Sequence, residues 1–177
     1  LGPEWSDEDM FIFTNHVKQT GVPVEAALAV YTAESNLDPK ASSGVAWGVP
    51  QMTAGTLKDL LWSEPAANFA KLGVADQSPW IQKLLEYQIK VIGFTPQTAL
   101  DLYVANFSPA AAKSKAFVIY DSKVPSQAAA YKANAGLDSK GKGHIDRNDL
   151  AAYLRSWVDS DTYRRAIDQV RKVQHVS

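Results

Sequence analysis

The feature that most constrains the fold of this chain is its division into short segments of helical length, separated by Pro, Gly and polar clusters. Apolar residues recur in several of these segments near the helical period, and no segment shows a sustained alternation of apolar and polar residues. We therefore predict helices over residues 6–21, 22–35, 53–62, 78–93, 95–107, 126–134, 146–158 and 160–174. The sequence predicts a single mainly α domain over residues 1–177, in which any sheet is marginal.

Single residues set the expected ends of the first two helices. Ser6 is expected to cap the first helix, and Gly21 to end it. Pro23 suits the first turn of the second helix, and Pro39 prevents that helix from continuing much beyond Asp38. The second helix should therefore pass directly into the glycine-punctuated loop that follows it.

The composition excludes several classes of function. The net charge is −1, with basic and acidic residues interleaved, so no basic face indicates nucleic-acid binding. No stretch approaches the roughly 18 consecutive apolar residues of a membrane span. The chain has no Cys, and its three His lack the spacing of a zinc peptidase, so we expect neither a metal nor a cofactor. It begins without Met, which indicates a processed or truncated product.

Glu34 is the candidate catalytic residue, because it shares the apolar face of its predicted helix. Ala27, Val30, Tyr31 and Glu34 fall at helical spacing, which directs the carboxyl toward the interior or a cleft. Partial burial and the negative helix end should both raise its pKa, as a general acid requires. The alternative is a structural carboxyl bonded to backbone amides of the following loop.

The loop after Glu34 combines Ser, Pro, Gly and Gln residues at a distinctive spacing. Residues 34–56 resemble the signature of the soluble lytic transglycosylase family, within the lysozyme-like superfamily. The matching pieces are Glu34-Ser35, Pro39, Ala41, Ser43, Gly44, Ala46, Gly48, Gln51 and Thr56. Because the combined spacing extends over about two dozen positions, the match is far more specific than a Glu-Ser pair alone.

A second stretch is similar to a later motif of the same family. Residues 102–112 look like the segment in which an aromatic residue and an Asn or His line the cleft opposite the glutamate. The family often has Tyr directly before this Asn, whereas Ala105 precedes Asn106 here, so Tyr103 is the candidate for that ring or hydroxyl. Together with residues 135–154, the layout resembles lytic domains of bacteriophage virions and tails. The resemblance covers roughly residues 20–155.

The resemblance implies a goose-type lysozyme or lytic transglycosylase fold, one mainly α domain with a cleft. The implied partner is the glycan strand of peptidoglycan, cut at the β-1,4 bond between N-acetylmuramic acid and N-acetylglucosamine. The enzyme would be a monomer without a cofactor, attached to a virion or acting in the host periplasm or cell wall. Glu34 would be the single catalytic residue, and the substrate-binding residues would be Ser43, Gln51, Met52, Tyr103 and Asn106.

The implied mechanism needs one carboxyl. Most glycosidases use two carboxyl groups, whereas the motifs here supply only Glu34. The N-acetyl group of the substrate would stabilise the oxocarbenium-like centre, and the sugar's 6-hydroxyl would attack to leave a 1,6-anhydro product. Asp38 is the nearest other acid and is expected to be a turn residue. A stem-peptide endopeptidase and a non-catalytic wall-binding virion or tail component remain the alternatives.

Single loop residues have two readings each. Ser43 could bond Glu34 or cap the loop, and Gln51 has a donor and an acceptor for an acetamido group. Gly48 could admit a sugar or serve a turn, and Trp47 could stack on a sugar or pack inside. The remaining tryptophans, by contrast, are expected in the core: Trp5, Trp62, Trp80 and Trp157.

Residues 138–149 have the register of a twelve-residue EF-hand loop, with an acid at each end and Gly at position six. Positions three and five hold Lys140 and Lys142, which offer no oxygen ligand. We therefore expect no calcium in this degenerate loop. The hypothesis is that a Lys ammonium occupies the space of the ion and neutralises the acidic residues Asp138, Asp146 and Asp149.

Overall fold

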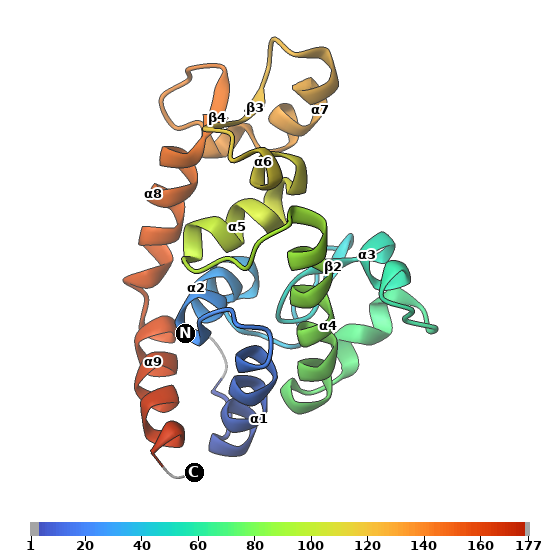
Figure 1. Ribbon diagram of the computed structural model, residues 1–177, viewed down its shortest axis with the longest axis vertical. Coiled ribbons are helices and arrows are strands. Elements are labelled where there is room, and N and C mark those ends of the chain that lie inside the picture. The colour runs from blue at the N-terminus through green and yellow to red at the C-terminus, as the bar shows by residue number, and fades with distance from the viewer. Residues whose placement is uncertain (1–3, 176–177) are drawn as a thin grey trace.

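The computed structural model describes residues 4–175, which are mainly helical (Figure 1). The α-helices are α1 (Asp7–Lys18), α2 (Val24–Ser35), α3 (Ala54–Asp59), α4 (Val74–Ile92), α5 (Ala99–Phe107), α6 (Pro109–Ser114), α7 (Pro125–Ala133), α8 (Arg147–Val158) and α9 (Asp161–Gln174). Two 3-10 helices join them, η1 (Ala66–Lys71) and η2 (Ala135–Leu137). The mainly α prediction is confirmed.

The sheets are as small as the sequence predicts. Strand β1 (Ala46–Trp47) pairs antiparallel with β2 (Met52–Thr53), and β3 (Val118–Asp121) pairs antiparallel with β4 (His144–Asp146). In the second pair, Ile145 of the EF-hand-like loop lies opposite Tyr120. This pairing holds the EF-hand-like loop to a distant segment of the chain.

The helix ends follow local chemistry, with small corrections. The Ser6 hydroxyl accepts the N–H of Asp9, which confirms the predicted cap. Helix α1 ends at Lys18, three residues before the predicted end at Gly21. Pro23 is the N-cap of α2 and lies just outside the first turn in which we expected it. Helix α2 stops where Asn36 takes a left-handed conformation, with φ 54°.

Helix α4 is longer than predicted. We expected it to begin at residue 78, whereas it begins at Val74 and runs through Pro79. Proline inside a helix removes one backbone hydrogen bond, and tertiary contacts have to offset that loss. The buried amide of Gln77 supplies such contacts, because its nitrogen donates to the carbonyl oxygens of Phe69 and Leu72 just upstream. Helix α6 and the two 3-10 helices were not predicted.

Helix α2 forms the centre of the core. Its residues from Ala26 to Thr32 are buried, and it packs against α1, α5, α8 and α9. Phe13 of α1 meets the Tyr31 ring edge-on at 6.3 Å. A helix that is apolar on all sides is normally buried in this way. The last turn of α2, which carries Glu34, therefore extends from the centre of the core.

A second, smaller apolar cluster lies beside the main core. It consists of Met52, Leu57, Leu60, Phe69 and Leu84. Trp47, Trp62 and Trp80 are partly buried against it. Of the four tryptophans expected in the core, Trp5 is buried, whereas Trp62, Trp80 and Trp157 are only partly buried.

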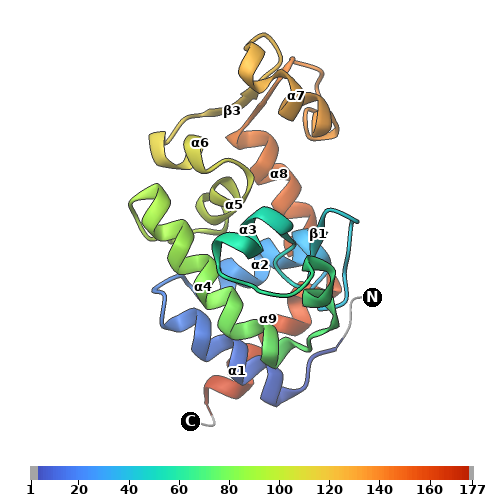
Figure 2. The same ribbon diagram turned by 90° about the vertical axis from the view of Figure 1, so that its right-hand side faces the viewer.

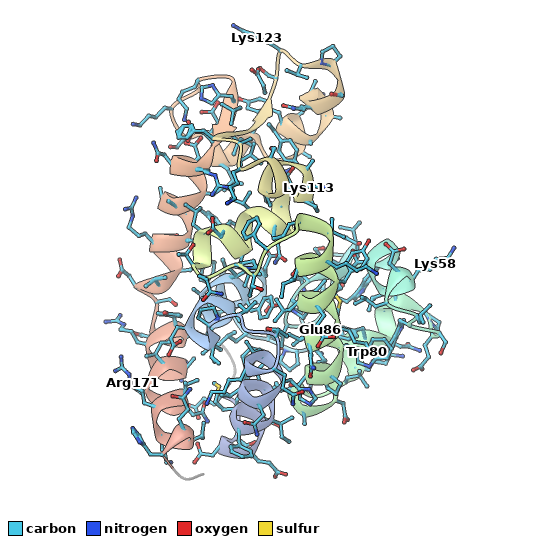
Figure 3. All side chains as sticks on the ribbon, viewed as in Figure 1. Lys58, Trp80, Glu86, Lys113, Lys123 and Arg171 are labelled. Carbon is cyan, nitrogen blue, oxygen red and sulfur yellow. The ribbon has the colours of Figure 1, made fainter. Side chains whose placement is uncertain are left out.

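Two lobes project from the helical body (Figures 1 and 2). The upper lobe, residues 118–146, contains β3, α7, η2 and β4. The side lobe, residues 41–72, contains β1, β2, α3 and η1. Lys123 and Lys58 mark their outer ends in Figure 3. Within residues 4–175, no helix has both the length and the apolar character that crossing a membrane requires.

Candidate functional site

One pocket collects most of the predicted site residues. It has a volume of about 450 Å³ and is lined from α2, the β1–β2 region, α3, α4, α5, the α7–η2 junction and α8. Its size falls within the usual range for ligand sites, about 300–1,000 Å³. Five of the six predicted residues line it, namely Glu34, Gln51, Met52, Tyr103 and Asn106.

Glu34 reaches the pocket from the last turn of α2. The next residue, Ser35, donates its hydroxyl to the carbonyl oxygen of Val49 at 2.7 Å and so ties the helix end to the loop. Glu34 is the only acidic residue among the described residues that line the pocket. The backbone that carries the carboxyl is thus held at the junction between the buried core helix and the loop.

Burial raises the pKa of Glu34 to about 7. Within residues 4–175, its carboxyl has no hydrogen-bond donor and no cation close enough for an ion pair. The alternative that loop amides bind this carboxyl is therefore not what the structure shows. A carboxyl with this pKa is partly protonated near neutral pH, so it can donate a proton and then take one back.

The nearest acid along the chain serves the turn. Asp38 accepts the backbone N–H of Lys40 at 2.9 Å and does not line the pocket. This is the turn role predicted for it, since an Asp side chain commonly bonds the backbone two residues on.

The loop between α2 and β2 is held by Gln77 of α4. The Gln77 oxygen accepts the N–H of Val49 at 2.9 Å, and its nitrogen donates to the carbonyl of Pro39 at 2.8 Å. Gly48 has φ +81°, and a Cβ there would lie 2.5 Å from the Phe69 ring. Gly48 is therefore required by its left-handed backbone conformation and by its close packing against Phe69, and it does not line the pocket.

Ser43 lies away from the pocket. It is exposed, and its hydroxyl accepts the N–H of Ala46 at 3.1 Å. Of the two roles proposed for it, the structure displays the loop cap. The amide that it binds belongs to the first residue of β1, so the Ser43 side chain holds the turn that leads into this strand. Its predicted contact with substrate has no counterpart in the pocket lining.

Gln51 offers the pocket an oxygen. Its side-chain nitrogen donates to the carbonyls of Ala41 at 3.1 Å and Gly48 at 2.9 Å, while the residue holds φ +54°. Because these bonds commit the nitrogen to the loop, the amide oxygen is the atom that remains to accept from a ligand. Gln51 can accept from an acetamido N–H, but it cannot also donate as the sequence suggested.

Tyr103 and Asn106 form the wall contributed by α5. The Tyr103 ring stacks on Tyr153 of α8, with centroids 6.1 Å apart and planes at 11°. Burial raises the pKa of Tyr103, and the charges of Glu34 and Tyr153 raise it further, so the phenol stays protonated. Asn106 accepts a hydrogen bond from Gln88 of α4. The pocket therefore places a neutral donor and fixed amides near one carboxyl.

Sequence reasoning missed Gln88, Asn134 and Tyr153, which also line the pocket. Gln88 carried a usable signal, because it falls at helical spacing with Ile81 and Leu85 on an apolar face, as Glu34 does on α2. Asn134 and Tyr153 lie far from the two motifs and carried none.

The EF-hand-like loop contains the predicted ammonium. The Lys142 Nζ lies 2.8 Å from Asp149 Oδ1, 3.5 Å from Asp138 Oδ1 and 3.8 Å from Asp146 Oδ2. The hydrogen bond to Asp149 raises the pKa of Lys142, so the side chain stays charged. An ammonium thus lies among the three acidic residues, as the hypothesis requires, and it belongs to Lys142 and not to Lys140. Within residues 4–175, no group of His, Cys, Asp and Glu side chains has metal-binding geometry.

In comparisons with known proteins, no family model matches the chain, and neither the curated proteins nor the solved structures give a match.

Proposed function

We propose that this protein is a lytic enzyme that cleaves the glycan strands of peptidoglycan, with Glu34 as its general acid and base. The observation that carries the proposal is the Glu34 carboxyl itself. It opens into a pocket of about 450 Å³, has a pKa of about 7 and has no protein partner within the described residues. A carboxyl left without partners in a pocket is free to exchange protons with a ligand.

The proposed bond is the β-1,4 link between N-acetylmuramic acid and N-acetylglucosamine. Glu34 protonates the leaving oxygen, and the acetamido group of the substrate stabilises the positive centre that forms. The sugar's 6-hydroxyl then attacks C1 while Glu34 takes its proton, which leaves a 1,6-anhydro ring. A second carboxyl is not needed, and this agrees with Glu34 being the only acid among the described lining residues.

The neighbours of Glu34 suit an acetamido sugar. The free Gln51 oxygen can accept its N–H, and the protonated Tyr103 hydroxyl can donate to its carbonyl. The thioether of Met52 and the ring of Phe107 offer apolar contacts on the same pocket. These groups would orient a sugar so that its glycosidic oxygen meets Glu34.

The finer assignments belong to the same proposal. The helical body, with its pocket at the end of a buried helix, is proposed to be a lysozyme-like domain of the lytic transglycosylase type. Its role is proposed to be local breach of a bacterial wall by a phage, acting from the virion or in the host periplasm. The family motif at residues 34–56 and the layout of residues 135–154 support both assignments.

The test is mass spectrometry of the fragments that the protein releases from purified peptidoglycan. We expect anhydromuramoyl products from the wild type and none from Glu34→Gln. Asp38→Asn is the matched control, because it removes a carboxyl four residues away that lies outside the pocket.

Each other outcome overturns a defined part of the proposal. Reducing muramoyl ends would make the enzyme a hydrolase. New peptide amino termini over intact glycan would point to an endopeptidase. Wall binding without any released fragment would leave a non-catalytic wall-binding component.

A further inference from the structure

The upper lobe contributes one side chain to the pocket. Asn134, at the C-terminal end of α7, is the only described residue of that lobe in the pocket lining. Its side-chain nitrogen donates to the carbonyl of Ala130 at 2.9 Å. Its side-chain oxygen has no partner within residues 4–175 and is therefore the atom that can accept from a ligand.

A short hydrogen-bonded segment fixes the backbone of Asn134. Its N–H donates to the carbonyl of Tyr131 at 3.0 Å, and its carbonyl accepts the N–H of Leu137 at 2.9 Å. The Tyr131 hydroxyl donates to Asp138 Oδ2 at 2.8 Å and so links the end of α7 to the EF-hand-like loop. The position of Asn134 therefore depends on where the Asp138 carboxylate is held.

Lys142 holds that carboxylate. The side chain of Asp138 is fully buried, accepts the backbone N–H groups of Lys142 and Gly143, and lies 3.5 Å from the Lys142 ammonium. Three carboxylates surround this one ammonium, and a buried charge that loses its partner is strongly unfavourable. Removing the ammonium would force the loop to rearrange, and Tyr131 would lose its fixed acceptor.

We propose that Asn134 is a further substrate-binding residue of the pocket and that Lys142 positions it through Asp138 and Tyr131. The first half rests on the proposed function, because Asn134 would accept a hydrogen bond from a hydroxyl or acetamido N–H of the glycan. The second half concerns the chain alone. The ammonium thus sets the shape of a binding wall, in addition to neutralising a loop.

The kinetic experiment uses Lys142→Met, Asn134→Ala and the double variant on soluble glycan strands. Each single variant is expected to raise KM up to about tenfold, the scale of one lost hydrogen bond, with kcat unchanged. The double variant should be no worse than the worse single variant, since both changes remove the same contact. Lys140→Met, an exposed lysine of the same loop, is the control and should match the wild type.

Additive effects in the double variant would overturn the link between the two residues, and an unchanged KM in Asn134→Ala would overturn the substrate contact. If Lys142→Met does not fold, Tyr131→Phe removes only the hydroxyl that reaches Asp138 and tests the same link.

Hydrogen exchange without substrate separates the two halves. Lys142→Met and Tyr131→Phe should both speed amide exchange in residues 125–137 and leave residues 24–60 unchanged. Unchanged exchange in residues 125–137 would overturn the positioning role whether or not the protein cuts glycan. Faster exchange in a protein that neither binds nor cuts glycan would support the positioning role, and would overturn both the proposed function and the substrate role of Asn134.

Discussion

Glu34 and Asp138 are both sheltered carboxyls, yet the chain surrounds them in opposite ways. Asp138 is buried, but hydrogen bonds from Tyr131 and two backbone N–H groups, with the nearby Lys142 ammonium, outweigh burial and lower its pKa to about 2. Glu34 has none of these within the described residues, and burial alone raises its pKa to about 7.

The difference shows how one chemical group serves two purposes. Partners fix a carboxylate in its charged form and make it part of the framework. Their absence leaves a carboxyl that changes its protonation state near neutral pH, which is useful only to a ligand that exchanges a proton with it. We therefore expect Glu34 to control activity and Asp138 to control stability and shape.

The largest expected effect is on catalysis. Glu34→Gln keeps the shape of the side chain and removes its proton chemistry, so kcat should fall about 10²- to 10⁴-fold. Asp138→Asn should alter KM more than kcat. Rates of anhydromuropeptide release check this, and a Glu34→Gln enzyme that keeps its kcat would break the comparison.

The pH–rate profile follows from the same carboxyl. General-acid catalysis needs Glu34 protonated, so kcat/KM should fall by about tenfold per pH unit above the pKa of about 7. Tyr31 and Tyr103, whose pKa values burial raises, stay neutral through this range. A profile that stays flat to pH 9 would contradict the assignment.

Glu34→Gln should raise the stability of the protein although it lowers the activity. The folded pKa of Glu34, about 7, lies above the unfolded value of 4.5, so the native state binds more protons and loses stability as pH rises between these values. At pH 8, Glu34→Gln should raise the free energy of unfolding by about 1–3 kcal/mol, allowing for solvent at the pocket mouth. Urea denaturation at pH 4 and pH 8 measures this, and equal gains at both would contradict it.

Asp138 should stabilise the protein near neutral pH and lose this effect at low pH. Its folded pKa of about 2 is below the usual value of 3.8, so it contributes stability that is present above the latter and lost as pH falls through the former. Asp138→Asn should therefore lower the melting temperature at pH 6 and make little difference near pH 2. A loss of the same size at both values would show that the charge of Asp138 is not what matters.

The smallest expected effect is a calcium titration of the wild-type protein. Because the Lys142 ammonium already lies among three carboxylates, calorimetry should show no saturable binding tighter than about 1 mM, the weak limit for EF-hand-like loops. Tighter binding would mean that the ammonium gives way to the ion.

What the sequence could predict depended on how local each cause is. Glu34 was identifiable because its place on an apolar helix face is a matter of spacing within one turn or two. The Lys142 cluster followed from the register of a single twelve-residue loop. The early start of α4 could not be foreseen, because Gln77 offsets the internal proline through partners such as Pro39 that lie far away in sequence. The place of Asn134 depended on a whole lobe for the same reason.

The contact among Gly48, Phe69 and Gln77 has a consequence for how this loop can change in evolution. A Cβ at Gly48 would lie 2.5 Å from the Phe69 ring and 2.8 Å from the Gln77 oxygen, so a larger residue at Gly48 requires a smaller one at Phe69 and a shift of Gln77. The same oxygen receives the N–H of Val49 beside the loop. In relatives of this chain the three positions should therefore change together, while the exposed loop positions around Gly44 drift independently.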